Sequence, residues 1–379
     1  MNFFLLIIAI CAVVVFVYAF LVLRVCSTWK KIPQFEASVK NVSTGVSIIV
    51  PARNEADRII QCIKSLIAQE FDKKLFEIIV VDDHSTDSTE AVVREYIMEH
   101  KEVSIKIISA VDSGQGKKNA IRQGIAESSS RLIITMDADC IAGKFWLNDL
   151  VAFYEKYKPK MIIGPVAISS EKTGFESIQS MELMSLVAFA AAYCFLEKPI
   201  MSNGANLLYE REAYLEVNGF EGIDGVASGD DVLLMNKFQK KFPGRIKFIK
   251  SKSAVVYTPA QQSIHEFIQQ HVRWASKGKE NMSSNSYLVA VSVTTLNAAV
   301  FTCLILSIFY GKFAVLFLIL TGAKFTVDYI LLRTVSVFFG KPVGFLRCLV
   351  SQLFYSFSVI TVLLLSLRGK YKWKDRIVK

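Results

Sequence analysis

Two acidic residues, Asp137 and Asp139, follow an apolar run in the segment RLIITMDADC at residues 131–140. The run is typical of a buried β-strand, so the two carboxylates are expected at the C-terminal end of that strand. In open α/β sheets, ligands bind outside the carboxyl ends of the strands, and an Asp-x-Asp pair there suits a hard divalent cation that bridges to phosphate oxygens. The alternative is a polar turn that closes a buried strand, because Asp-x-Asp is a short and frequent pattern.

Two further residues stand where they can bind a charged ligand. Asp83 ends the apolar run at residues 76–83, where its carboxylate can accept the imide N–H of a uracil ring. The alternative is that Asp82, Asp83 and Asp87 cap the following helix, because acids are favoured there. Lys117 follows a glycine and can reach a diphosphate as a point charge, unless it is a solvated surface lysine.

Strand and helix patterns alternate along the globular part of the sequence. Apolar, β-branched runs predict strands, and apolar residues at helical spacing predict helices between them. The predicted strands lie at 47–51, 76–83, 103–109 and 132–134, and the predicted helices at 59–67, 90–98 and 119–126. Because each return between parallel strands needs a crossover, the alternation predicts an α/β fold with a mostly parallel, Rossmann-like sheet flanked by helices.

The composition indicates a membrane protein. Of the 379 residues, 52% are hydrophobic, and the mean hydropathy of +0.38 is too high for an ordinary soluble protein. Residues 1–23 are expected to form a transmembrane anchor and not a cleaved signal peptide, because the apolar run is long and a basic flank follows it. About three more spans are expected within residues 285–367, at 287–310, 313–332 and 345–367.

Charge and cysteine usage narrow the classes of partner. The net charge of +10 fits an anionic membrane surface, an acidic substrate or nucleic acid. Nucleic acid is not expected as a partner, because the basic residues are dispersed between apolar segments. The seven cysteines and four histidines show no metal-site spacing, and the cysteines are read as reduced residues on a cytosolic face.

The ordered motifs together resemble the family 2 inverting glycosyltransferases, which have the A-type fold. Val-Pro-Ala-Arg-Asn-Glu, Val-Val-Asp-Asp, Gly-Lys-Lys-Asn-Ala and Met-Asp-Ala-Asp occur in that order, at 50–55, 80–83, 116–120 and 136–139. The resemblance continues with Gly-Asp-Asp at 229–231 and with Gln-His-Val-Arg-Trp at 270–274. The last of these matches the Gln-x-x-Arg-Trp motif of membrane-anchored polysaccharide synthases and lipid glycosyltransferases. The resemblance covers roughly residues 47–278.

The resemblance implies roles for particular residues. A divalent metal, Mg²⁺ or Mn²⁺, is expected at Asp137 and Asp139, and the general base is expected at Asp231, with Asp230 beside it where many relatives carry Glu. The acidic pair is equally expected in the first turn of a helix, where acids are favoured. The implied nucleotide-binding residues are Pro51, Ala52, Glu55, Asp83, Lys117 and Asp137, and those implied for the acceptor and diphosphate are Asn203, Gly204, Gln270, Arg273 and Trp274.

Two segments have a plainer alternative reading. Residues 265–277 also fit an interfacial amphipathic helix with an aromatic anchor, and residues 181–195 read as a core or interface helix that is too short for a confident span. The expected domains are the anchor at 1–23, a linker at 24–45, a cytoplasmic glycosyltransferase domain at 46–284, the spans within 285–367 and a basic tail at 368–379.

The expected location is the plasma or inner membrane. The positive-inside rule places the catalytic domain in the cytoplasm. Three spans after that domain would put the tail at 368–379 outside, yet the tail is basic and favours the inside. The sequence therefore disagrees with itself on the number of C-terminal spans.

The expected function is an enzyme, a membrane-bound hexosyltransferase that moves a sugar with inversion from a nucleotide diphosphate-sugar. The expected donor is a UDP-sugar, and the expected partners are a lipid-linked or growing glycan acceptor and membrane lipids. One alternative is a single-sugar transferase that makes a glycolipid, in place of a processive synthase. An alternative of another class is a membrane transporter or binding module with a regulatory nucleotide-binding domain.

Overall fold

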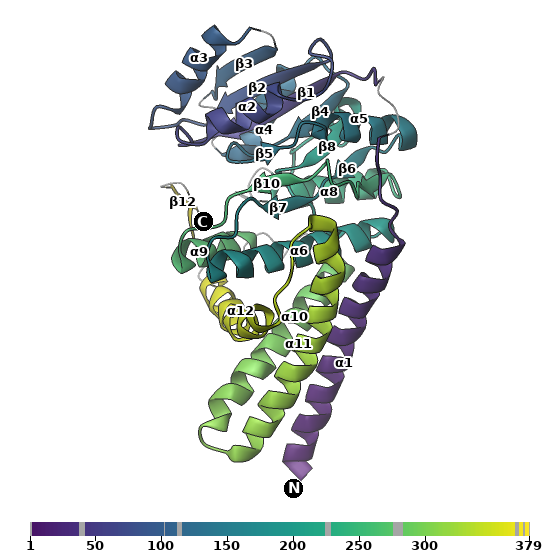
Figure 1. Cartoon of the computed structure of the whole chain (residues 1–379), viewed down its shortest axis with the longest axis vertical. Helices are drawn as coiled ribbons and strands as arrows, with labels where there is room; N and C mark the ends of the chain where they lie inside the picture. The colour runs from purple at the N-terminus through teal and green to yellow at the C-terminus, as the bar shows by residue number, and fades with distance from the viewer. Residues whose placement is uncertain are drawn as a thin grey trace.

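The computed structural model describes residues 2–37, 42–101, 103–111, 116–223, 229–275, 283–367, 371–373 and 376–378. Part of the predicted loop before Lys117, the end of the family resemblance near residue 278 and half of the basic tail lie outside these residues. Within them, the chain forms an α/β body and a helical body (Figure 1). The long helices α1, α10 and α11 project together from the α/β body.

A seven-stranded sheet with the order β3-β2-β1-β4-β8-β6-β9 is the centre of the α/β body. β1 pairs in parallel with β2 and β4, and β8 runs antiparallel to both β4 and β6. The sheet is therefore mixed but mostly parallel, as predicted. The strands are β1 (Val46–Ala52), β2 (Phe76–Asp82), β3 (Ser104–Ser109), β4 (Leu132–Thr135), β6 (Met161–Ile163), β8 (Leu207–Glu210) and β9 (Ile246–Phe248).

Helices cover both faces of this sheet because its central strands are apolar on both sides. On one face, Ile48 and Val50 of β1 join the core formed with α2 (Ile59–Ile67) and α5 (Trp146–Tyr157). On the other face, Ile49 joins the core formed with α4 (Lys117–Ala126). Gly124 allows the close approach of α4, since a Cβ there would lie 2.6 Å from a methyl of Ile49. The other helices of the α/β body are α3 (Thr89–Glu99), α7 (Arg211–Glu216), α8 (Asp230–Lys241) and α9 (Ile264–Ala275).

A smaller sheet lies between the large sheet and the helical body (Figure 1). Its strand order is β5-β10-β7, with β5 at Ile141–Ala142, β7 at Val166–Ile168 and β10 at Val256–Thr258. The short strands β11 (Tyr371–Trp373) and β12 (Arg376–Val378) pair with each other, and β11 contacts α9.

The helix α6 (Gly174–Phe195) is longer than the segment 181–195 that we expected. Its start is fixed by a capping box, in which the Thr173 side chain accepts from the Glu176 backbone N–H and Glu176 bonds back to Thr173. The polar first turns hid this extension, because they interrupt the apolar pattern. At 22 residues the helix is long enough to cross a membrane, but 67% of its apolar window is buried inside the protein.

Five helices of the described chain are long and apolar enough to cross a membrane: α1 (Asn2–Lys31), α6, α10 (Ser284–Ser307), α11 (Gly311–Phe339) and α12 (Phe345–Ser366). This finding is compatible with membrane anchoring. Four of them match the predicted anchor and C-terminal spans, although α1 runs past residue 23 to Lys31 and α11 runs past residue 332 to Phe339. The expected domain division stays a prediction. All seven cysteines are free and buried.

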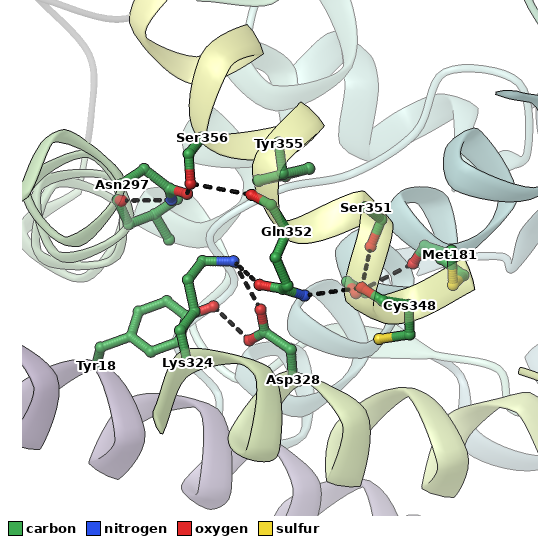
Figure 2. A network of polar contacts seen from close by, with 12 residues as sticks. Tyr18, Met181, Asn297, Lys324, Asp328, Cys348, Ser351, Gln352, Tyr355 and Ser356 are labelled. Carbon is green, nitrogen blue, oxygen red and sulfur yellow. Dashed lines mark hydrogen bonds and ion pairs between the residues drawn. The ribbon is translucent and has the colours of Figure 1, made fainter. Parts of the chain in front are cut away.

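Polar side chains connect the long helices at one level of the helical body (Figure 2). Lys324 of α11 donates to Asp328 Oδ2 at 2.8 Å and to Gln352 Oε1 of α12 at 2.6 Å. Tyr18 of α1 donates to the other Asp328 oxygen at 2.5 Å. Ser356 of α12 donates to Asn297 of α10. These contacts tie four helices together inside an otherwise apolar bundle.

Candidate active site

Two adjoining cavities open at the edge of the sheet where the parallel strands end. The outer cavity has a volume of about 750 Å³, and the inner cavity, which lies toward α6, has a volume of about 140 Å³. Their shared lining shows where they meet: Lys117, Asp137, Thr258, Pro259, Gln261, Gln270 and Arg273.

The register of the sheet places the acidic motifs on the outer cavity. Ala52 pairs with Asp82, so β1 and β2 end side by side, and β4 ends next to β1 on its other side. Residues that follow these strands therefore gather at one edge. Of the residues predicted to bind nucleotide or metal, the outer cavity is lined by Pro51, Ala52, Glu55, Asp83, Lys117, Asp137 and Asp139.

Asp83 is held in one orientation by the backbone around it. Its side chain is almost fully buried, and Oδ1 accepts the Gly116 N–H at 3.1 Å and lies 3.2 Å from His84 Nδ1. Arg53 donates to the Asp83 carbonyl at 2.8 Å. A fixed carboxylate of this kind can accept an N–H from a planar base in the outer cavity.

The neighbouring acids, Asp82 and Asp87, make contacts of the capping kind. Asp82 accepts the Ser85 N–H, and Asp87 accepts from the backbone and hydroxyl of Thr89 at the start of α3. Burial raises the pKa of Asp87, but its hydrogen bonds to Thr89 outweigh this and lower the pKa overall. These contacts support the reading of Asp82 and Asp87 as structural residues.

Lys117 joins the two cavities electrostatically. It lies in the first turn of α4, and its Nζ is 2.5 Å from Asp137 Oδ1 and 3.7 Å from Asp230 Oδ2. Burial disfavours the charged ammonium, but the carboxylates of Asp137, Asp230 and Asp231 overcome this and raise the pKa of Lys117. Lys117 is therefore a permanently charged cation at the junction of the cavities.

Asp137 and Asp139 fit a divalent cation that takes its other ligands from water and from substrate phosphates. Their side chains are 39% and 26% exposed to the outer cavity, and Arg58 Nη1 is 3.9 Å from Asp139. Among the described residues, no group of three or more His, Cys, Asp or Glu side chains gathers as a complete protein-made metal site. Mg²⁺ and Mn²⁺ suit a pair of carboxylates, because they accept waters and substrate phosphates as further ligands.

Asp231 is oriented into the inner cavity by two backbone donors. It lies in the first turn of α8, where Oδ1 accepts the Val232 N–H at 2.8 Å and Oδ2 accepts the Gly204 N–H at 3.2 Å. Thr135 at the end of β4 donates to the Gly204 carbonyl at 2.9 Å, which fixes the position of Gly204. The predicted helix start at the acidic pair is confirmed, because Asp230 and Asp231 lie in the first turn of α8, and the role of Asp231 as the base stays a prediction.

Helix α9 carries the Gln-x-x-Arg-Trp motif, and residues of this motif line both cavities. Gln270 and Arg273 line both, as their helical spacing predicted, and Trp274 lines the inner cavity alone. Phe267, one turn before Gln270 and also part of the inner cavity lining, packs in edge-on and tilted contacts against Phe175 of α6 and Phe354 of α12.

The structure brings every predicted site residue to one of the two cavities, and it adds others that the sequence reading missed. Asn203, Gly204, Asp230 and Asp231 all line the inner cavity. Among the residues missed are Arg58, the loop residues 258–262 between β10 and α9, and Gln179 and Glu182 of α6. The loop has no periodic pattern, but Glu182 left a signal, since it is an acid in an otherwise apolar stretch of α6.

Comparison with known proteins identifies relatives of the α/β body. Residues 47–217 match the family model described as glycosyl transferase family 2. The probable glycosyltransferase YdaM of Bacillus subtilis (strain 168) is 34% identical over 110 residues, which cover 29% of this chain and 26% of that protein. Poly-beta-1,6-N-acetyl-D-glucosamine synthase of Staphylococcus aureus (strain MSSA476) is 26% identical over 239 residues, which cover 62% of this chain and 55% of that protein. The chain thus spans between a quarter and somewhat over half the length of these relatives.

One solved structure is similar over nearly the whole chain. It is described as the mannosyltransferase PcManGT from Pyrobaculum calidifontis in complex with GDP-Man and Mn2+, and it superposes with a TM-score of 0.66. The match covers 96% of this chain and 98% of that one at 17% sequence identity. At this identity the likeness concerns the fold, and it confirms the predicted A-type fold with apolar helices at the termini.

Proposed function

We propose that the chain transfers a sugar from a nucleotide diphosphate-sugar to a lipid-linked or glycan acceptor, with inversion, because residues 47–217 match the family model described as glycosyl transferase family 2. This match and the glycosyltransferase relatives support the predicted enzyme class, a glycosyltransferase. The observation that carries the proposal is the pair of adjoining cavities, one lined by the phosphate-binding groups and the other by Asp231.

The outer cavity suits the donor. Asp83 would accept an N–H of the base, and a uracil fits this because its imide group offers one. Lys117 and Arg273 line the junction, where their charges would stabilise the diphosphate as it departs. Asp137 and Asp139 would hold the Mg²⁺ or Mn²⁺, which supplies further positive charge to the phosphate oxygens when bound.

The inner cavity suits the acceptor and the proton transfer. The acceptor hydroxyl would attack the anomeric carbon from the face opposite the diphosphate while Asp231 takes the hydroxyl proton. The new C–O bond forms as the bond to the phosphate oxygen breaks, and the nucleoside diphosphate leaves with the electron pair. The Gly204 N–H bond to Asp231 Oδ2 would hold the base in the required direction.

The apolar helices support an acceptor that lies near a membrane. The inner cavity is lined in part by Leu183 and Leu186 of α6, a helix that packs against α1 and α11. An acceptor with a lipid portion can therefore reach Asp231 from the membrane side. The Gln-x-x-Arg-Trp motif of α9 favours a growing glycan, and a single-sugar transfer to a lipid is the alternative within the same chemistry.

We propose that the catalytic domain faces the cytoplasm and that α12 lies along the membrane surface. Lys341, just before α12, contacts Ile168 and Glu171 of the α/β body, and α12 itself packs against α9, which β11 also contacts. Both ends of α12 are thus near the α/β body. With α1, α10 and α11 as the crossing helices, the basic tail would stay on the cytoplasmic side, which removes the conflict in the positive-inside pattern.

The test of the proposed function is transfer by the full-length protein in membranes with a panel of UDP-sugars. We expect metal-dependent release of UDP and a labelled product, and we expect D231N to reduce transfer by about 10²- to 10⁴-fold while the protein stays folded. The matched control is D72N, because Asp72 is an exposed acid whose turn contact to the Lys74 N–H an asparagine can keep.

Each other outcome has a definite meaning. Full activity of D231N would refute the assignment of the base. Movement of a substrate across the membrane with no UDP release from any sugar would favour the transporter or binding module. A ladder of product sizes would indicate a processive synthase, and a single added sugar would indicate a glycolipid-forming enzyme.

A further inference from the structure

Inside the motif of α9, His271 faces away from the donor and forms an ion pair with α6. Its Nε2 lies 2.9 Å from Oε1 of Glu182, and both side chains are largely buried, at 16% and 9% exposure. Its Nδ1 lies 2.7 Å from the Phe267 carbonyl oxygen. Because a carbonyl and a carboxylate are both acceptors, each ring nitrogen is placed to donate, which is the bonding of a protonated imidazolium.

The groups around His271 favour its charged form. Burial opposes the charge, but Glu182 and the Phe267 carbonyl overcome it and raise the pKa of His271. The described charged or titratable groups that face the pair are Glu182 of α6 and, across Glu182, Tyr355 of α12, whose phenol bonds to the same carboxylate. On α9 itself the neighbours are aromatic, with the Trp274 ring centroid 4.8 Å from the His271 ring.

Glu182 is therefore the point where three helices meet. It accepts His271 of α9 and Tyr355 of α12, and it lies on α6. The contact continues into the helical body, because Lys324 Nζ of α11 lies 5.4 Å from the centroid of the Tyr355 ring, and Lys324 is bonded to Asp328 and Gln352 (Figure 2). Polar contacts thus run from the lining of the inner cavity to the interior of the long helices.

We propose that Glu182 and His271 are a positioning pair that fixes α9, and with it Trp274, against the inner cavity so that the acceptor is held for transfer. This inference rests on the proposed function. His271, Trp274 and Glu182 all line the inner cavity, whereas none of the three lines the outer cavity. The pair therefore acts on the acceptor more than on the donor.

We assign the orientation of α9 to the ion pair and not to its apolar contacts. The cluster under α9 contains three buried residues, Phe267, Ile268 and Val272, and hydrophobic packing is not directional. An ion pair with a hydrogen bond fixes both distance and direction. Small displacements of groups that hold a substrate can reduce the rate strongly, so this direction matters for transfer.

The ion pair between His271 and Glu182 should weaken as the pH rises. Since the pKa of His271 is raised in the folded protein, the pair is fully formed below the ordinary histidine pKa and is lost as the pH rises through the raised value. Acceptor use should then fall on the alkaline side. The same dependence should be missing when the histidine is replaced by a residue that does not titrate there.

The experiment measures donor and acceptor kinetics of the full-length protein between pH 6 and pH 9. This range of about three pH units includes the ordinary histidine pKa and the values above it. H271Q removes the charge, and H271K keeps a cation that titrates only near pH 10, as lysine does. E182Q and the double variant E182Q/H271K test whether the cation acts through Glu182. H100Q is the matched control, because His100, which directly follows α3, also contacts the carbonyl four residues before it, at Tyr96.

We expect H271Q to lower kcat/KM for the acceptor by about 10-fold near pH 7, since a small misplacement of groups that hold a substrate reduces the rate strongly. The Kd for UDP should change little, and the alkaline decline should disappear. H271K should restore acceptor use and retain it at the alkaline end of the range, whereas E182Q/H271K should not. Unfolding temperature, measured without substrate, should be pH-dependent in the wild type and less so in H271Q.

Unchanged acceptor kinetics in H271Q, or restoration by H271K that does not need Glu182, would overturn the positioning pair. Wild-type protein that releases no UDP with any sugar would refute the proposed function instead. In that case the pair itself is judged by the unfolding temperatures, and an equal pH dependence in the wild type and H271Q would refute it as well.

Discussion

Lys117 Nζ lies 2.5 Å from Oδ1 of Asp137, at the place where the two cavities meet. The contact joins the start of α4 to the end of β4, two elements that the sheet brings to one edge. It places a permanent cation between the proposed donor and acceptor sides. The charge is balanced by three carboxylates from two motifs that are far apart in the sequence, Asp137 in one and Asp230 and Asp231 in the other.

The first prediction concerns this lysine. K117M should weaken binding of UDP by about 10- to 100-fold, because a hydrogen bond to a charged group contributes about 1.5–3 kcal/mol. Titration calorimetry with UDP and the metal measures the change. The matched control is K118M, since Lys118 donates to the Ile223 carbonyl at 2.7 Å and should affect stability more than UDP affinity. Equal loss of UDP affinity in both variants would contradict the role given to Lys117.

The second prediction concerns the divalent metal. Chelation with EDTA should abolish UDP release, and added Mg²⁺ or Mn²⁺ should restore it. D139N should raise the metal concentration needed for half-maximal activity by about 10-fold or more, because a neutral amide is a poorer ligand for a hard cation than a carboxylate. A metal titration of the rate measures this shift. Activity that survives EDTA in full would exclude the metal site at Asp137 and Asp139.

The third prediction concerns Gly204. A Cβ at this position would lie 3.0 Å from Lys117 Nζ and 3.3 Å from Asp230 Oδ2, so G204A should displace the charged groups at the junction. We expect a loss of kcat of about 10-fold or more, since misplacement of reacting groups is costly, with little change in unfolding temperature. G174A is the control, because a Cβ at Gly174 meets nothing within 4 Å. Wild-type kinetics in G204A would show that this close approach is not required.

The positions of the site residues followed from the order of strands and motifs. Parallel strands end at one edge, so the sequence predicts that Asp83 and Asp137 lie near each other, and the register of β1, β2 and β4 places them there, with Pro51 on the same cavity. The predicted A-type fold is confirmed, and the match of residues 47–217 to the family 2 model supports the glycosyltransferase class. The mostly parallel sheet followed from local patterns and strand geometry, whereas the A-type fold and the enzyme class followed from the resemblance of the ordered motifs to a known family.

Other features depend on packing that a local pattern does not encode. Glu182 lies two turns into α6, and only the folded arrangement brings it to the inner cavity and to His271. The loop residues 258–262 reach both cavities because of the path from β10 to α9, which has no periodicity. The composition of α12 is the same whether it crosses a membrane or lies against α9, so its contacts, and not its hydropathy, bear on the number of spans.

The last prediction concerns the ion pair within the long helices. Lys324 is 3% exposed and bonds to Asp328, which also accepts from Tyr18. K324M leaves the Asp328 carboxylate buried without its cation, which should lower the free energy of unfolding by about 3 kcal/mol.

The double variant K324M/D328N should be more stable than K324M alone, because it removes both charges while an asparagine can still accept the Tyr18 hydroxyl bond. Unfolding of the wild type, K324M, D328N and K324M/D328N in detergent, followed by circular dichroism, measures the loss in each variant. A double variant that loses the sum of the two single losses would mean that the charges do not interact. Restored stability would show that Lys324 and Asp328 act as a pair that ties α1, α11 and α12 together beneath the inner cavity.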